Sequence, residues 1–287
     1  MNQVDSHCHI WKLSRNDYHW MDQTNPDLAP IAKDFSIDDY INSSKSHLPS
    51  RIVLVQAAAT EAETEFLLSI AESNPLVGAV VGWVDLSKNN VIASVTEFRK
   101  NQKFRGIRPM LQDIEDTDWL ISTPDQNIWT ALAKLNVCFD ALIKPRHLIM
   151  IKEFCRNQNE LNIVIDHAAK PQWPDSSFDL DSYLQHIEDI ASNDHVYCKI
   201  SGLLTELSQQ QNLDPKKYVE PVVKHLIECF GSNRLMWGSD WPVINLVSDY
   251  IAWYEMCENM ISYLPEADRQ NIFANTAEKF YQLGEIA

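Results

Sequence analysis

The sequence predicts a (β/α)₈ barrel, or TIM barrel, formed by a single α/β domain over residues 1–287. Eight short apolar runs rich in β-branched residues alternate with segments of helical periodicity. Such alternation is typical of a parallel sheet that is covered by helices. Eight strand–helix units match the number in this barrel, and 287 residues lie near its usual ~250. A doubly wound open sheet is the structural alternative.

The predicted strands are apolar in their centres and are bounded by polar or turn residues. They cover residues 3–10, 51–57, 76–86, 104–111, 137–144, 162–168, 196–203 and 235–242. The predicted helices cover residues 37–47, 61–74, 91–101, 125–135, 148–159, 182–192, 215–230, 247–262 and 265–281. In the second of these, Phe66, Leu67, Ile70 and Ala71 recur at the spacing of one helix face. Because a barrel carries its reactive groups at the carboxyl ends of its strands, a site is expected there.

Composition makes several classes of partner poor candidates. The chain has 40 acidic and 24 basic residues, a formal net charge of −16. We therefore expect neither nucleic acid nor an anionic membrane as a partner, because both attract basic surfaces. A neutral or cationic small-molecule substrate is expected, or an anionic one where a local arginine offsets the field. The oligomeric state stays open, and a homo-oligomer is compatible with the sequence.

The compartment is expected to be the cytoplasm. The first residues have no basic and apolar signal-peptide pattern, and no apolar run reaches the ~20 residues of a membrane span. The six cysteines are widely spaced, which favours buried reduced thiols over a disulfide framework.

Two histidines stand at the end of the first predicted strand, in the run Asp5-Ser6-His7-Cys8-His9. Residues two apart on a strand face the same side, so His7 and His9 both point into the mouth of the barrel. Such imidazole pairs suit zinc, manganese or iron, although an ordinary buried hydrogen-bond network is the alternative. Asp5 lies one layer deeper, where its carboxylate is expected to accept a ring N–H.

The sixth and eighth predicted strands place two more polar residues at the same end of the barrel. His167 follows the apolar run 163–165, and Asp240 precedes Pro242, which cannot continue a central strand. A carboxylate near three imidazoles can ligate a metal or take a proton from water. The alternatives are a structural role for His167 and a helix cap or turn for Asp240.

Three motifs occur in order along the chain: DSHCH at residues 5–9, IDHAAKP at residues 165–171 and WGSDWP at residues 237–242. YHW at residues 18–20, RGIRP at residues 105–109 and KISGL at residues 199–203 accompany them. Through these motifs nearly the whole chain resembles the amidohydrolase superfamily. Within it, the chain resembles the amidohydrolase-2 group of L-fuconolactonases, L-rhamnonolactonases and 2-pyrone-4,6-dicarboxylate lactonases. The pattern is specific for fold and superfamily and less specific for substrate.

The resemblance implies a role for each strand-end residue. Asp240 corresponds to the family's general base. His7, His9 and His167 correspond to histidines that bind a metal or polarise a carbonyl. The implied metal ligands are therefore His7, His9, His167 and Asp240, and Asp240 and His167 are the implied catalytic residues.

The residues of the fourth and fifth predicted strands indicate how many metal ions the site can hold. Members with two metals need a bridging Lys or Glu on a middle strand and a histidine on the next. Here the fourth predicted strand offers Arg105 and Arg108, and the fifth offers Asp140 and Lys144 without a histidine. We therefore expect one divalent metal, zinc or manganese, or none, since the group includes members that work without metal.

Residues at other strand ends are predicted to contact the substrate. The resemblance implies substrate contact for Arg108, whose guanidinium can hold a carboxylate or ring oxygens, with an ion pair as the alternative. Indole rings suit sugar faces, with core packing as the alternative for each. A buried lysine can neutralise an anion or pair with Asp140, and a glutamine can bind a hydroxyl. The predicted contact residues are Arg108, Gln56, Trp20, Trp83, Lys199 and Trp241.

The expected function is hydrolysis of a sugar lactone of the L-fucono- or L-rhamnono-lactone type. Asp240 would activate a water, and a single metal, or the imidazoles with Arg108, would stabilise the developing oxyanion. A metal-dependent decarboxylase of the same fold is one alternative. A catalytically inactive barrel that binds a small ligand is the other, and the base beside three imidazoles argues against it.

Overall fold

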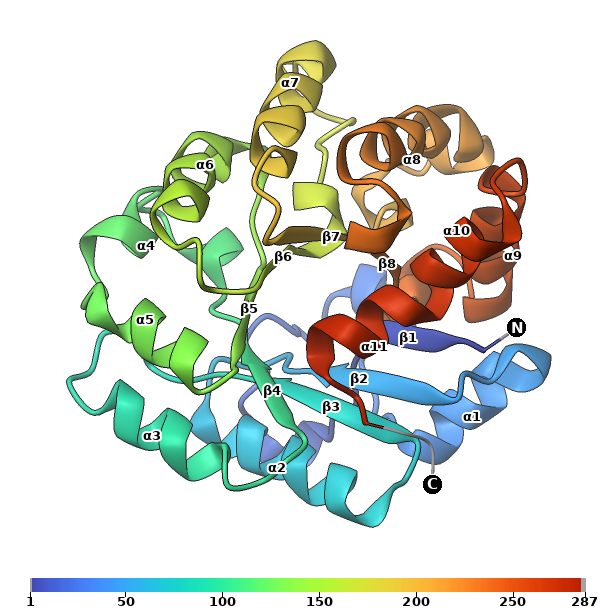
Figure 1. Cartoon of the computed structure of the whole chain (residues 1–287). Helices are drawn as coiled ribbons and strands as arrows, with labels where there is room; N and C mark the ends of the chain where they lie inside the picture. Colours follow the sequence, from blue (N-terminus) through green and yellow to red (C-terminus); the bar gives the residue numbers. More distant parts are fainter. Residues whose placement is uncertain (1, 285–287) are drawn as a thin grey trace.

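The structure, a computed structural model, describes residues 2–284 and contains one sheet of eight parallel strands in the order β1 to β8. Figure 1 shows the strands at the centre of the molecule with the helices around them. The strands are β1 (Val4–Cys8), β2 (Arg51–Val55), β3 (Val77–Gly82), β4 (Phe104–Ile107), β5 (Cys138–Ala141), β6 (Ile163–Ile165), β7 (Val196–Ile200) and β8 (Leu235–Trp237). The predicted (β/α)₈ barrel is confirmed.

The helices follow the strands as the periodicity predicts, and several begin at a polar cap. The Ser36 side chain accepts from Asp39 N, and Thr60 accepts from Glu63 N, so each satisfies an N–H that has no partner within its helix. The helices are α1 (Ile37–Ser44), α2 (Glu61–Ser73), α3 (Val91–Phe98), α4 (Trp119–Ser122), α5 (Asn127–Lys134), α6 (Leu148–Asn157), α7 (Leu180–Ala191), α8 (Lys216–Phe230), α9 (Tyr250–Met260), α10 (Glu266–Gln270) and α11 (Thr276–Tyr281).

The ring of strands closes between the end of β1 and the segment that follows β8. His9 N donates to Trp241 O at 2.7 Å, and Asp240 N donates to His7 O at 2.8 Å. These two hydrogen bonds continue the parallel pairing beyond the last residue of β8. They also place the histidines of the first strand directly beside the aspartate of the last.

Some elements are shorter than predicted. β6 ends at Ile165 and β8 at Trp237, because the residues that follow turn out of extended conformation. His167 (φ 53°) and Asp240 (φ 56°) both adopt the left-handed backbone conformation, which residues other than glycine seldom adopt. The last predicted helix is divided by a π-helical turn, Asn271–Asn275, between α10 and α11.

A small apolar cluster fills the interior of the barrel at its amino-terminal end. Strand residues such as Val53, Val81 and Val164 contact one another there, and Phe280 and Tyr281 of α11 complete the cluster. In Figure 1 α11 lies across this end of the barrel. Because helix and side chains seal this end, only the carboxyl ends of the strands are open to a substrate.

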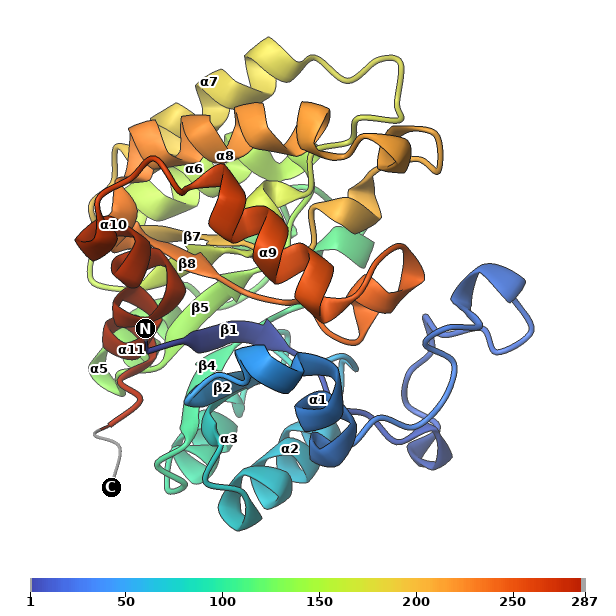
Figure 2. The same cartoon turned by 90° about the vertical axis from the view of Figure 1, so that its right-hand side faces the viewer.

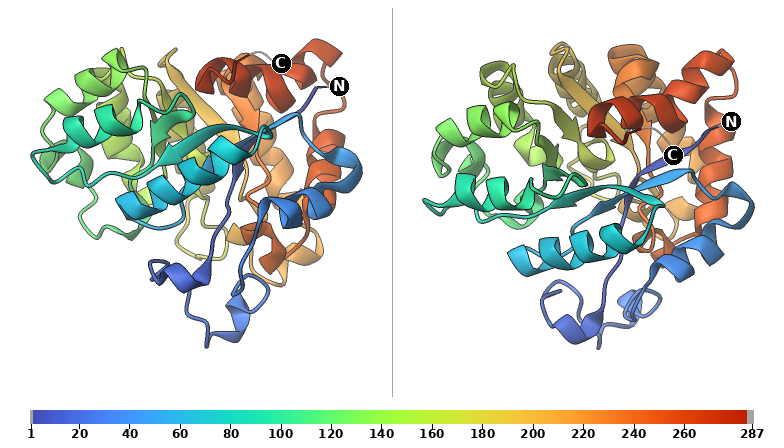
Figure 3. Two further views of the ribbon diagram at one scale, coloured as in Figure 1. Left: turned by 90° about the horizontal axis from the view of Figure 1, so that it is seen from below. Right: turned by 60° about the horizontal axis from the view of Figure 1, so that its bottom comes forward.

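The loop of residues 11–35 leaves the barrel at its open end. It projects well beyond the strands in Figure 2, and Figure 3 shows the same loop from two further directions. An antiparallel bridge between Trp11 and Phe35 joins the two ends of the loop. All six cysteines are free thiols, and none of the helices within residues 2–284 is long and apolar enough to cross a membrane.

Candidate active site

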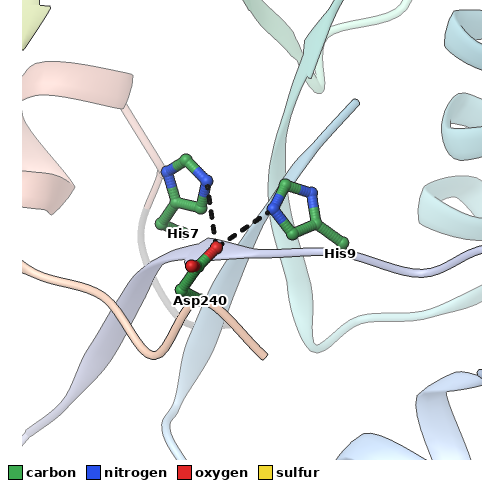
Figure 4. A group of neighbouring side chains, drawn as sticks. All are labelled: His7, His9 and Asp240. Carbon is green, nitrogen blue, oxygen red and sulfur yellow. Dashed lines mark ion pairs between the residues drawn. The ribbon is translucent and has the colours of Figure 1, made fainter. Parts of the chain in front are cut away.

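The end of β1 supplies two histidines that face Asp240. Strand alternation directs both rings to the open end of the barrel, as expected. His7 Nε2 lies 3.8 Å and His9 Nε2 3.3 Å from Asp240 Oδ1 (Figure 4). Asp5 does not accept the imidazole N–H that was expected: its Oδ1 accepts from His7 N at 3.1 Å and from Ser239 N at 2.9 Å, and its Oδ2 accepts from Tyr40 OH at 2.7 Å. Asp5 therefore ties the ends of β1 and β8 together below the histidines.

His167 reaches the same carboxylate from a left-handed turn after β6. Four consecutive residues, 167–170, have positive φ. The turn brings His167 Nε2 to 4.0 Å from Asp240 Oδ1, and Ser201 Oγ lies 2.8 Å from His167 Nδ1. Gly202 (φ 61°) is required here, because a Cβ on it would lie 2.4 Å from His167 Nδ1. Burial lowers the pKa of His167 to about 4, so the ring is neutral at pH 7.

Asp240 is buried and ionised. Its burial acts to raise the carboxyl pKa, but the neighbouring imidazoles of His167, His9 and His7 hold that pKa well below its usual value. Gly238 makes room for the strand beside it, since a Cβ there would lie 2.7 Å from the Cβ of His7. An ionised carboxylate at the open end of a barrel can accept a proton or bind a cation.

The donor set fits a divalent metal. His9 Nδ1 lies 2.8 Å from Val55 O, and a carbonyl only accepts, so Nδ1 carries a hydrogen. In the neutral form of that tautomer, the Nε2 lone pair faces Asp240. Two acceptors that face each other attract a proton or a cation. One ligand atom each from His7, His9 and Asp240 lie within 4.8 Å of one another, and His7, Asp166 and His167 form a second such group. These separations suit a metal with ligands at ~2.0–2.2 Å.

Arg108 lies at the end of β4 and is 3% exposed. Its Nη1 is 3.4 Å from both Asp166 Oδ2 and His7 Nε2, and its Nη2 donates to Gln56 O. A second hydrogen bond joins the same two residues, because Gln56 Nε2 donates to Arg108 O at 2.5 Å. Gln56 is fully buried and positions the arginine.

A charged cluster lies directly below the histidines. Lys199 Nζ contacts Asp140 Oδ2 at 2.6 Å, Asp166 Oδ1 at 3.0 Å and His7 Nδ1 at 3.1 Å. Tyr281 OH donates to Asp140 at 2.7 Å. Burial acts to lower the Lys199 pKa, but the two carboxylates raise it on balance. Lys199, His7 and Arg108 together hold the Asp166 pKa low despite burial.

A pocket of about 190 Å³ opens above Asp240. Of the residues predicted from the sequence, His9, Trp20, Arg108, His167 and Asp240 line it. The remaining predicted residues lie elsewhere: His7, Gln56 and Lys199 are buried beneath, Trp83 lines a neighbouring cavity, and Trp241 is buried against Phe35 and Tyr40.

Sequence reasoning missed Asp166, which joins Arg108, Lys199 and His7 in one contact network. Its signal was available, since it is a carboxylate directly after the apolar run of β6 and next to His167. Lys170 and Gln112, which also line the pocket, were missed as well. They lie on loops whose conformation carries no periodic pattern.

Comparison with known proteins gives a consistent result. Residues 4–283 match the family described as Amidohydrolase. The chain is 38% identical to an L-fucono-1,5-lactonase of Burkholderia ambifaria, over 98% of this chain and 96% of that protein. It superposes with a TM-score of 0.88 on a crystal structure of an amidohydrolase from Burkholderia multivorans with bound Zn, at 30% identity, covering 99% and 100% of the two chains.

A 2,6-dihydroxybenzoate decarboxylase from Rhizobium shares the fold alone, with 13% identity, a TM-score of 0.65 and 99% coverage of both chains. The family match over residues 4–283 and the full-length identity to an L-fucono-1,5-lactonase agree with the predicted barrel and family. On these grounds the chain belongs to the amidohydrolase family.

Proposed function

We propose that this protein hydrolyses sugar lactones of the L-fucono-lactone type, with Asp240 as the general base. One observation carries the proposal: a buried, ionised carboxylate faces Nε2 of three histidines at the base of a small pocket. Arg108 and Trp20 line the same pocket, so a charged donor and an aromatic ring lie beside the base. The full-length relative named as an L-fucono-1,5-lactonase supports the same substrate class.

Asp240 accepts a proton from water as the water oxygen attacks the lactone carbonyl carbon. The tetrahedral intermediate then collapses, and the bond between the carbonyl carbon and the ring oxygen breaks. Asp240 returns its proton to the departing ring oxygen, which becomes a hydroxyl group. The product is the open-chain hydroxy acid, whose atoms are those of the lactone plus one water. A low carboxyl pKa keeps the base ionised at neutral pH.

Arg108 and His167 stabilise the negative charge that develops on the carbonyl oxygen. Arg108 is held rigidly by its exchange of hydrogen bonds with Gln56, so little reorganisation is needed as charge appears. When Ser201 donates to His167 Nδ1, the neutral ring carries its hydrogen on Nε2 and donates it into the pocket.

His7, His9 and Asp240 would hold a divalent metal, with His167 beside them. When bound, such a metal supplies a Lewis acid for the carbonyl oxygen and lowers the pKa of a bound water. The protein's own residues fix its place, because His9 is held by Val55 O and His7 by contacts with Lys199 and Asp166.

The proposal is tested by a pH-indicator screen over L-fucono-, L-rhamnono- and galactono-lactones. Metal-stripped enzyme is compared with enzyme supplied with Zn²⁺ or Mn²⁺. Acid release that depends on enzyme concentration is the expected result, and the metal arms show whether turnover requires the ion.

The screen also separates the alternatives. Carbon dioxide release from aromatic carboxylates without acid release from any lactone would establish a decarboxylase. Stoichiometric binding of a lactone without turnover in every arm would establish a ligand-binding barrel and contradict the proposal.

A further inference from the structure

A second cavity lies beside the pocket above Asp240, which we call the reactive pocket, at the open end of the barrel. It has a volume of about 320 Å³ and lies over the ends of β2, β3 and β4. Trp20, Ala57, Met110 and Asp113 line both spaces, so the two cavities share a boundary. Trp20 is fixed at that boundary, because its Nε1 donates to Ala57 O at 2.7 Å.

The lining of the second cavity resembles that of a carbohydrate subsite. Three indoles, Trp20, Trp83 and Trp119, supply flat apolar faces of the kind that stack on a sugar ring. Asp113 and His19 offer polar groups that can bind hydroxyls. No lysine or arginine occurs among the described residues that line the cavity, which makes it a poor site for an anionic substituent.

The sizes of the two cavities point to one extended ligand. At about 190 Å³, the reactive pocket is smaller than the ~300 Å³ at which ordinary ligand pockets begin, and the second cavity brings the combined space into that range. A single lactone ring fits the first space. A second ring attached to it would extend past Trp20 into the second.

We propose that the second cavity is a subsite for a glycosyl substituent, so that the enzyme acts on lactones that carry a second sugar ring. This inference rests on the proposed lactonase function. The boundary residues would contact both rings, whereas Trp119 would contact the second ring only. Trp119 therefore provides a substitution that separates the two spaces.

The test compares kcat/KM for D-glucono-1,5-lactone and for cellobiono-1,5-lactone, its 4-O-glucosyl derivative. We expect the wild type to prefer the disaccharide lactone by roughly three- to ten-fold, the gain from one aromatic stacking contact. Trp119→Ala should abolish that preference while the simple lactone is hydrolysed as before. Trp119→Leu, which keeps an apolar contact with the core, provides a second variant in case alanine impairs folding. Tyr263→Ala removes an exposed aromatic ring outside both cavities and should retain the preference.

Binding of the open-chain products provides a readout that needs no turnover. Calorimetry should show cellobionate binding more tightly than gluconate to the wild type, and equally to Trp119→Ala. The subsite would be overturned if the wild type bound cellobionate and gluconate with equal affinity. It would also be overturned if Trp119→Ala weakened the binding of both ligands by the same factor. If neither lactone is hydrolysed while cellobionate still binds more tightly, the subsite stands, and the screen over L-fucono-, L-rhamnono- and galactono-lactones decides the lactonase proposal separately.

Discussion

The two sides of the reactive pocket are built in different ways. We call His7, His9, His167, Asp240 and Arg108 the floor, and the loop of residues 11–35 the wall. The floor stands on strand ends, and backbone hydrogen bonds between His7, His9 and the residues after β8 fix its geometry.

The wall is attached to the barrel by side chains: Tyr18 OH donates to Glu63 Oε2 at 2.7 Å, and Trp20 Nε1 donates to Ala57 O. Within the wall, Trp11 Nε1 donates to Lys33 O at 2.8 Å, and backbone hydrogen bonds shape the loop. Under the proposed function, the reactive groups are thus anchored in the sheet, whereas the loop beside the substrate depends on a few side-chain contacts. Such a division allows the loops of a barrel to vary while its reactive groups stay in place.

The largest effect is expected from the floor. Asp240→Asn should lower kcat by roughly 10²–10⁴-fold, because the variant cannot accept a proton from water. Its circular dichroism spectrum and unfolding midpoint should remain close to those of the wild type. Asp181→Asn, at an exposed position on α7, is the matched control and should retain full activity. Undiminished turnover in Asp240→Asn would falsify the assignment of the base.

Removal of the charge below the floor should reduce stability. Lys199→Met leaves Asp140 and Asp166 buried without their ammonium partner, and should lower the free energy of unfolding by ~3–5 kcal/mol. Urea unfolding at pH 7 measures the change. Lys224→Met removes an exposed partner of Glu220 on α8 and should cost at most ~1 kcal/mol. Equal losses in the two variants would mean that the buried cluster does not support the floor.

Gly202 tests whether the floor tolerates a displaced ring. Gly202→Ala places a methyl group against His167 and should lower kcat/KM, in addition to a backbone penalty of ~1–2 kcal/mol for positive φ. Gly231→Ala also places a side chain at positive φ (φ 67°, ψ 167°), and its nearest contact is the Asn233 side chain. Steady-state kinetics should therefore show a loss in the first variant only. Both variants should lose unfolding free energy, and Gly202→Ala should lose more, because its methyl group also clashes with the buried His167 ring.

A pH titration should reveal the buried carboxylate that holds the wall. Burial raises the pKa of Glu63 to about 7, so the folded protein binds a proton that the unfolded chain releases at the lower ordinary value of 4.5. Wild-type stability therefore carries a contribution that is complete below pH 4.5 and is lost as pH rises towards 7, at up to ~1.4 kcal/mol per pH unit.

Glu63→Gln stays neutral and should lack this loss, so the difference in unfolding free energy from the wild type should change across that window. Glu65→Gln, an exposed neighbour on α2, should run parallel to the wild type throughout. A constant difference between wild type and Glu63→Gln from pH 4.5 to 7 would show that Glu63 does not bind a proton there.

The smallest effect is expected from the wall's own aromatic ring. Trp20→Ala should raise KM by roughly five-fold, equivalent to ~1 kcal/mol of aromatic contact, and should leave kcat nearly unchanged. Trp20→Phe keeps a ring but loses the hydrogen bond to Ala57 O, and should give an intermediate KM. If kcat falls instead, Trp20 acts in the chemical step and the distinction between floor and wall fails.

The residues of the floor could be predicted from the sequence, because strand periodicity determines which side chains face the open end of the barrel. Alternation places His7 and His9 on one face, and the barrel rule brings His167 and Asp240 to the same end. The left-handed turn at residues 167–170 was not predictable, since it depends on Gly202 from the next strand–loop unit.

Tryptophans were harder to place. Trp83 lines the second cavity and Trp241 is buried against two aromatic rings, yet in the sequence both stand near the carboxyl end of a predicted strand. Their positions depend on loops packed by contacts distant in sequence, for which a single chain offers no periodic signal. Lys199 was recognised as a charge near the site, but its pairing with Asp166 needed the structure.

The backbone pairing between β1 and the segment after β8 also decides how early in synthesis the site can assemble. His7 and His9 leave the ribosome early, but the carboxylate that faces them emerges more than two hundred residues later. Until then the β1 edge lacks the backbone partner that closes the ring, and the imidazoles face no carboxylate from the segment after β8. The group of His7, His9 and Asp240 therefore cannot assemble until residue 240 has been made.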